Sequence, residues 1–162
     1  MGKRGFIFLS LGLILIFIMV EALAQKNVSL PRDMKNYRHI NTLVVPVDSS
    51  IHGIHHFYIN VKGLETFKSE VEGDEYPTGT KIIGKVYKVV ETGAGRIKEG
   101  DLAAFTYMEK APKVPVTKDT GGWIFAKFDA KGNRVQIDPV KDCFQCHRPH
   151  SKSDFVLSEP LQ

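Results

Sequence analysis

The sequence contains very little cysteine, only two residues in 162. Two cysteines cannot hold a small domain together, which excludes a disulfide-dense miniprotein. Excess charge is also lacking, because the net charge is only +4 at pH 7 and the basic residues are spread along the chain, so no nucleic-acid partner is expected. With 43% hydrophobic residues the chain has neither the composition of a disordered protein nor that of a multi-span membrane protein, and its length suits one domain.

The one long apolar run lies at the N-terminus. Lys3 and Arg4 precede an uncharged stretch over 5–20, and Ala22-Leu23-Ala24 follows it. These are the three parts of a secretory signal peptide, so we predict a signal peptide over 1–24 and a single domain over 25–162. An uncleaved N-terminal membrane anchor is the alternative, although the run is shorter than the ~20 residues that span a bilayer. Either way the domain is expected to be exported, to the periplasm or an equivalent compartment.

Most of the remaining chain is rich in β-branched and aromatic residues between turn signals. This pattern predicts a mainly β fold of the α+β type, with an antiparallel sheet, a few short helices and a C-terminal C-x-x-C-H segment. The expected helix covers 62–70. The expected strands cover 37–45, 54–61, 80–90, 102–108 and 123–128, with a hairpin into 134–137.

Both cysteines fall in one string near the C-terminus, Cys143-Phe144-Gln145-Cys146-His147. C-x-x-C-H is the attachment signature of a c-type haem. The two thiols would form thioether bonds with the two vinyl groups of one porphyrin, and His147 would be an axial ligand of the iron. A local disulfide and half of a zinc site are the alternatives, but no thioredoxin-like context surrounds the pair and a structural zinc takes four ligands. We therefore predict one haem c, bound covalently through Cys143 and Cys146.

The ligand on the other side of the iron decides the function, and the sequence leaves it open. His55 and His56 are adjacent in an expected strand, so their side chains should point to opposite faces. Met108 lies in another expected strand, where a buried core methionine is the ordinary role. No dominant second ligand emerges, which favours an open or weakly occupied position.

The order of these landmarks resembles the cytochrome P-460 family, which includes the β-sheet cytochromes c′ (cytochrome c′-beta). The resemblance rests on the strand 37–46, on the stretches 53–60, 76–80 and 118–123, on Phe125 and Phe128, and on the C-x-x-C-H string. It implies an antiparallel β body around one haem c, and it implies that the protein forms a homodimer, as family members often do.

The resemblance also implies a division of function at one position. Members that oxidise hydroxylamine carry a lysine, cross-linked to the porphyrin edge, on the strand after a Pro-x-Gly-Thr turn. In the c′-beta members apolar residues cap a five-coordinate iron that binds nitric oxide or carbon monoxide. Gly84 falls where the lysine is expected, and Lys85 is one residue further along. Lys85 and Lys81, which share a face, should point away from the haem unless a bulge intervenes.

The preferred function is the reversible binding of nitric oxide or a similar small nitrogen species. Phe57, Phe105 and Phe125 are the expected lining of the distal side, with His55 or His56 beside them. Large apolar side chains over an open iron would exclude water and admit neutral diatomic molecules, and no acid-base constellation is apparent in the sequence.

Two alternatives stay open, so the sequence does not decide whether the protein is an enzyme. In the first it oxidises hydroxylamine, with Lys85 or Lys81 cross-linked to the porphyrin. In the second it is an electron carrier with a redox partner protein, and His55, His56 or Met108 completes a six-coordinate iron.

Overall fold

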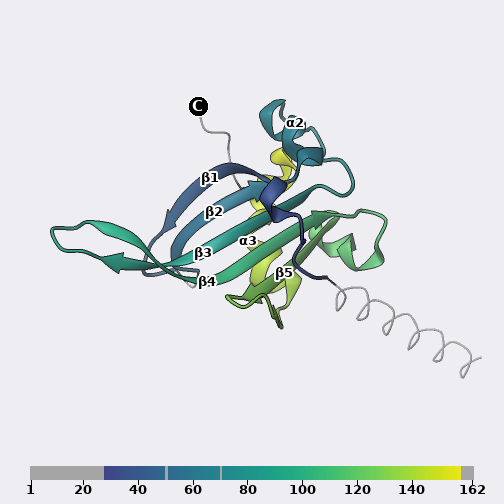
Figure 1. Cartoon of the computed structure of the whole chain (residues 1–162). Helices are drawn as coiled ribbons and strands as arrows, with labels where there is room; N and C mark the ends of the chain where they lie inside the picture. The colour runs from purple at the N-terminus through teal and green to yellow at the C-terminus, as the bar shows by residue number, and fades with distance from the viewer. Residues whose placement is uncertain (1–27, 50, 70, 158–162) are drawn as a thin grey trace, which may run out of the picture.

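The structure, a computed structural model, describes residues 28–49, 51–69 and 71–157. Within these residues six strands form one antiparallel sheet whose spatial order follows the order of the chain (Figure 1). The strands are β1 (Arg38–Val45), β2 (Gly53–Ile59), β3 (Lys81–Glu91), β4 (Ile97–Lys110), β5 (Trp123–Asp129) and β6 (Arg134–Val135). The predicted fold class, a mainly β protein with an antiparallel sheet, is therefore confirmed.

Two strands differ in length from the expectation by more than one residue. β4 begins at Ile97 rather than at Leu102, because backbone pairing with β3 continues through a charged stretch that has no hydrophobic alternation. The paired ends of β3 and β4 project beyond the rest of the sheet (Figure 1). β6 covers only two of the four residues that the sequence predicted for it.

Short helices lie before, between and after the strands. α2 agrees with the expected helix, and it buries Phe67, with Leu64 three positions earlier, against the sheet. The helices are η1 (Met34–Asn36), α2 (Val61–Ser69), η2 (Pro115–Thr120), η3 (Pro139–Phe144), α3 (Gln145–His147) and η4 (Arg148–Ser153). No helix in the described ranges has the length and apolar character needed to cross a membrane, and the predicted signal peptide lies outside these ranges.

The sheet has a covered face on each side. We call the face on which the C-terminal segment 139–156 packs the inner face, and this segment runs behind the sheet in Figure 1. Alternate residues of the central strands point to it: His55, Phe57 and Ile59; Ile82, Gly84 and Val86; Ala104, Thr106 and Met108; and Trp123, Phe125 and Lys127. The inner face therefore brings four strands together beneath the C-x-x-C-H segment.

The opposite, outer face carries the other alternate residues of the same strands. Its buried cluster includes Ile83, Phe105, Tyr107 and Phe128. The N-terminal residues 28–34 pack against this cluster through Val28, Leu30 and Met34. The two ends of the described chain thus cover opposite faces of one sheet.

Candidate haem site

The C-x-x-C-H string lies in a run of helical turns that begins after Asp138. The Asp138 carboxylate accepts hydrogen bonds from the backbone N–H groups of Val140 (3.0 Å) and Lys141 (3.2 Å), and Pro139 occupies the first helical position. An acidic cap followed by proline is a strong helix-start signal, so the sequence starts the segment here. The turn over 139–144 is π-helical, a rare geometry that is frequent at functional sites.

Cys143 and Cys146 are free thiols in consecutive helical turns. Residues three apart in a helix lie on the same side, so one flat group can reach both sulfurs. Cys143 is half-buried and packs against the inner-face cluster, whereas Cys146 is exposed. Burial raises the pKa of the Cys143 thiol to about 11, and the nearby Asp142 adds to this rise, so Cys143 is a protonated thiol at neutral pH.

A single carbonyl group orients the His147 imidazole. Its Nδ1 lies 2.7 Å from the carbonyl oxygen of Phe155. Because a carbonyl oxygen only accepts, Nδ1 carries the proton and Nε2 carries the lone pair. Burial lowers the pKa of His147 below its ordinary value, and this outweighs the opposing effect of the Phe155 hydrogen bond. The ring is therefore neutral and presents Nε2, which is the form and the nitrogen that a haem iron requires.

A cluster of three phenylalanine rings adjoins this histidine. The centroid of the Phe125 ring is 4.9 Å from that of His147 and 6.3 Å from that of Phe144, and Phe144 is 5.1 Å from Phe155. Phe125 comes from β5, while the other two belong to the C-terminal segment. These contacts hold the segment on the inner face and place the apolar Phe125 ring directly against the imidazole.

Of the three phenylalanines expected to line the distal side, the structure places two on the inner face. Phe57 and Phe125 both lie there. Phe105 does not, because it belongs to the outer-face cluster and pairs with Lys85 and Phe128 across the sheet. Alternation shows which residues of a strand share a face, but it does not show which of the two sets faces the C-terminal segment.

His55 and His56 point to opposite faces. His55 is buried on the inner face, and its Nε2 donates to the carbonyl oxygen of Ile51 at 2.8 Å. His56 lies on the outer face, where its Nε2 is 2.7 Å from Glu99 and its Nδ1 is 2.7 Å from the Thr42 hydroxyl. Of the two candidates, the fold brings only His55 to the side of the sheet that His147 occupies.

Lys81 and Lys85 both lie on the outer face. The Lys81 ammonium is 3.9 Å from the carboxylate of Glu109, and the Lys85 ammonium lies over the ring of Tyr58, 5.0 Å from its centroid. The pairing of β3 with both neighbours is continuous from residue 82 to Val86, so no bulge turns either lysine inward.

Gly84 occupies the inner-face position between these lysines. A Cβ atom at this position would lie 3.0 Å from Cε1 of Phe57 and well inside contact distance of the Thr106 hydroxyl oxygen. The Phe57 ring and Thr106 thus close over the glycine backbone. From 82 to 86 the inner-face residues of β3 are Ile82, Gly84 and Val86, none of which is a lysine.

Lys127 is an inner-face residue that we did not single out from the sequence. It pairs with Thr106, and its charge acts to lower the pKa of both the Cys143 thiol and the His55 imidazole, so its ammonium lies near both groups. The signal that could have found it is the alternation over 123–128, which puts Lys127 on the same face as Trp123 and Phe125.

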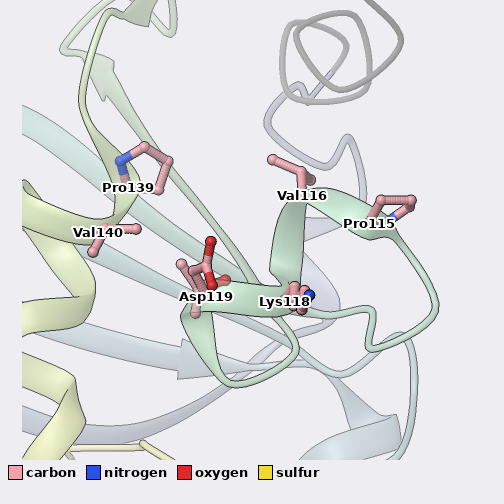
Figure 2. A pocket seen from close by; sticks show the side chains of 7 residues that line it. Pro115, Val116, Lys118, Asp119, Pro139 and Val140 are labelled. Atoms are coloured by element: carbon pink, nitrogen blue, oxygen red, sulfur yellow. The ribbon is translucent and has the colours of Figure 1, made fainter. Parts of the chain in front are cut away.

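A cleft of about 250 Å³ opens beside the start of the C-terminal segment (Figure 2). It lies between η2 and η3 and is lined by Pro115, Val116, Lys118, Asp119, Thr120, Pro139 and Val140. None of these described residues belongs to the inner-face cluster that holds Phe125 and Phe144. The cleft therefore lies outside that cluster.

Two free thiols on one side of a helical segment and a neutral, oriented imidazole directly after them define a haem-binding protein of the cytochrome class. The chain matches the family model for cytochrome P460 over residues 31–158. It therefore belongs to the cytochrome P460 family, and its cofactor is a haem.

One curated protein also shows a local likeness. A DNA gyrase subunit from Haloquadratum walsbyi is 39% identical to this chain over 54 residues. That stretch is 32% of this chain and only 6% of the gyrase protein, so it shows no shared family.

Proposed function

We propose that this protein is an exported monohaem cytochrome c that reversibly binds nitric oxide or a similar small nitrogen species at its haem iron. Thioether bonds to Cys143 and Cys146 hold the haem, and Nε2 of His147 is its axial ligand. The single observation that supports a gas-binding role is the apolar inner face next to an imidazole whose Nε2 is free to ligate.

The inner-face side chains favour a neutral ligand. Phe57, Ile82, Met108 and Phe125 offer apolar surface beside the C-terminal segment. An anion beside these apolar side chains loses hydration, which is costly, whereas nitric oxide and carbon monoxide have little hydration to lose. The Lys127 ammonium is the inner-face group that would attract an anion instead. The expected ligand is therefore a neutral diatomic molecule.

The outward position of the two lysines argues against hydroxylamine oxidation through a lysine–haem cross-link. To bring Lys81 or Lys85 inward, β3 would have to slip by one residue in its pairing. Such a slip would turn every side chain of the strand over and take Ile82 out of the buried cluster. The favoured state is a haem without a third covalent bond.

The electron-carrier alternative needs a sixth ligand from the inner face. His55 and Met108 lie there, and both are buried: Nε2 of His55 donates to Ile51, and Met108 belongs to the core cluster. A six-coordinate iron would take one of these buried side chains as its ligand, and His55 would bind through Nδ1, which the Ile51 hydrogen bond leaves unprotonated. An iron that stays five-coordinate is the simpler outcome.

Absorption spectra of the reduced holo-protein separate these functions. The protein is produced in a host that matures c-type cytochromes and is then titrated with carbon monoxide and nitric oxide. We expect ordinary haem c bands and a high-spin ferrous iron whose spectrum changes with either gas. A low-spin iron indifferent to carbon monoxide would support the electron carrier, and a strongly red-shifted ferrous band with a third covalent attachment would support the enzyme.

A matched pair of variants tests the assigned face. Phe57→Leu should change the rate at which carbon monoxide binds, because this ring lies on the inner face, whereas Phe105→Leu, on the outer face, should leave the rate unchanged. Equal effects from both substitutions would contradict the proposed location of the ligand site.

The export of the protein is tested separately. We expect the mature chain from the native host to begin at Gln25 and to fractionate outside the cytoplasm. A mature chain that retains Met1 and sediments with membranes would favour the anchored alternative.

A further inference from the structure

We propose that the buried ion pair between Lys110 and Asp154 positions the axial histidine, because it fixes the carbonyl group that orients His147. This inference rests on the proposed function in one respect, namely that His147 ligates the haem iron.

The ion pair is almost completely shielded from solvent. The side chain of Lys110 is 4% exposed and that of Asp154 is 5% exposed, and Nζ lies 2.6 Å from Oδ1. The Lys110 ammonium also donates to the carbonyl oxygen of Gly121 at 3.3 Å and lies 5.4 Å from the centroid of the Trp123 ring. Buried charges need such additional partners, because burial takes away their hydration.

Asp154 ties the C-terminal segment to the sheet at further points. Its Oδ2 accepts a hydrogen bond from the backbone N–H of Tyr76 at 2.9 Å. Its backbone carbonyl accepts a hydrogen bond from the indole N–H of Trp123, also at 2.9 Å. Three sites far apart in the sequence, at residues 76, 110 and 123, thus converge on one residue of the segment.

Phe155, the residue after Asp154, holds the histidine. Asp154 and Phe155 both have a left-handed backbone, with φ values of 48° and 65°, which residues other than glycine adopt only when their surroundings enforce it. The Phe155 N–H donates to the carbonyl oxygen of His150 at 2.7 Å, and the Phe155 carbonyl accepts from Nδ1 of His147 at 2.7 Å. The ring of Phe155 packs directly on Gly121, where any Cβ atom would overlap it.

The Lys110–Asp154 ion pair therefore affects how strongly His147 binds the iron. A hydrogen bond from Nδ1–H to a carbonyl group makes Nε2 more basic and fixes the rotation of the ring. Without the ion pair, Asp154 and Phe155 can relax from their left-handed conformation, and the carbonyl moves away from His147. The iron–histidine bond should then weaken although every residue that contacts the haem is unchanged.

The test compares Asp154→Asn and Lys110→Met with Glu72→Gln in the holo-protein. Glu72 pairs with Lys152, two residues before Asp154, but both partners are exposed, at 63% and 81%. The readouts are the iron–histidine stretching band of the ferrous protein by resonance Raman spectroscopy and the affinity for carbon monoxide. We expect the first two variants to lower the frequency of this band and to change the affinity about tenfold, the scale typical of groups that orient a metal ligand.

The controls separate positioning from a general loss of structure. Glu72→Gln should match the wild type, and Lys110→Arg, which keeps the charge, should retain the wild-type band. An unchanged band in both Asp154→Asn and Lys110→Met overturns the proposal, and so does an equal shift in Glu72→Gln. If Asp154→Asn does not accumulate, Lys110→Met decides, because it leaves the Asp154 side chain and its hydrogen bond from the Tyr76 N–H in place.

A measurement on the wild type covers the case in which neither variant folds. The Nδ1 proton of His147, which the haem iron shifts in the NMR spectrum, should exchange slowly with solvent, and fast exchange overturns the proposal. A wild-type protein without haem or without an iron–histidine band would instead contradict the proposed function itself, so the two failures are distinguishable.

Discussion

Replacing Gly84 with alanine tests how closely the inner face is packed beside Phe57. The new Cβ would lie 3.0 Å from the Phe57 ring and inside contact distance of the Thr106 hydroxyl, so both side chains must move. Overpacking of this kind destabilises a protein by about 1–3 kcal/mol. Alanine at an ordinary backbone conformation, which Gly84 has, returns about 0.4–1 kcal/mol by restricting the unfolded chain. The expected net loss is about 1–2 kcal/mol in the free energy of unfolding.

The same geometry predicts that the effect depends on Thr106. In a Thr106→Ala background the overlapping hydroxyl is gone and only the approach to the Phe57 ring is left, so Gly84→Ala should cost much less than in the wild type. The interaction free energy of the double-mutant cycle should then be about 1 kcal/mol or more. Thr92→Ala, in the distant loop between β3 and β4, is the control and should be additive with Gly84→Ala.

Denaturant unfolding of the four proteins in the cycle gives these values, and carbon monoxide binding gives a second readout because the Phe57 ring must shift. Gly84→Ala with wild-type stability and no coupling to Thr106→Ala would show that these side chains do not close over Gly84, and the argument against a side chain at this position would fail.

Three further predictions concern the packing of the segment and its surroundings. Phe144→Ala should lower the free energy of unfolding by about 3–5 kcal/mol, because its ring is buried between two others. Val135→Ala, at an exposed site, should lower it by less than about 0.5 kcal/mol. Comparable losses in denaturant unfolding would contradict this packing. Lys110→Met should lower the free energy of unfolding by about 3–5 kcal/mol, because it leaves a buried carboxylate unpaired. Glu72→Gln, in an exposed ion pair, should lower it by less than about 1 kcal/mol. Equal unfolding midpoints would refute this difference. Burial holds the pKa of His55 below its ordinary value, so the unfolded chain binds a proton there that the folded chain does not. Stability should therefore fall as the pH drops below about 6.5, with a shallower slope in His55→Gln; identical slopes would contradict the burial of this imidazole.

Much of the sheet could be predicted from local patterns. β2, β3 and β5 are runs of β-branched and aromatic residues that end at turn residues, and this signal is strong over five or more positions. The first five residues of β4, 97–101, carry no such pattern, because their pairing depends on backbone hydrogen bonds to β3 rather than on buried side chains. Only the partner strand reveals them.

The faces of the strands were harder to assign than the strands themselves. Alternation correctly separates His55 from His56, but it leaves open which set of β4 residues meets the C-terminal segment, and Phe105 fell on the other side. That choice depends on how chain ends far away in the sequence fold over the sheet. The inner-face position of Lys127 was not predicted for a related reason, since a charged residue in an apolar strand is ordinarily exposed.

The anchor at Asp154 could not be found from the sequence. Lys110 and Asp154 are 44 positions apart, and each stands in a charged or polar stretch that is typical of a surface loop. They are buried because the end of β4, the start of β5 and the C-terminal segment meet in the folded chain. By contrast, the C-x-x-C-H string is readable because its chemistry needs residues that are neighbours in the chain.

The intact mass of the mature protein tests most directly whether one haem is bound to this segment through its two sulfurs. Purified from a host that matures c-type cytochromes, the wild type should have the mass of the processed chain plus one haem, retained after denaturation. The Cys143→Ser/Cys146→Ser double variant should have the mass of the polypeptide alone. A colourless wild-type protein with the mass of the bare polypeptide would contradict the account.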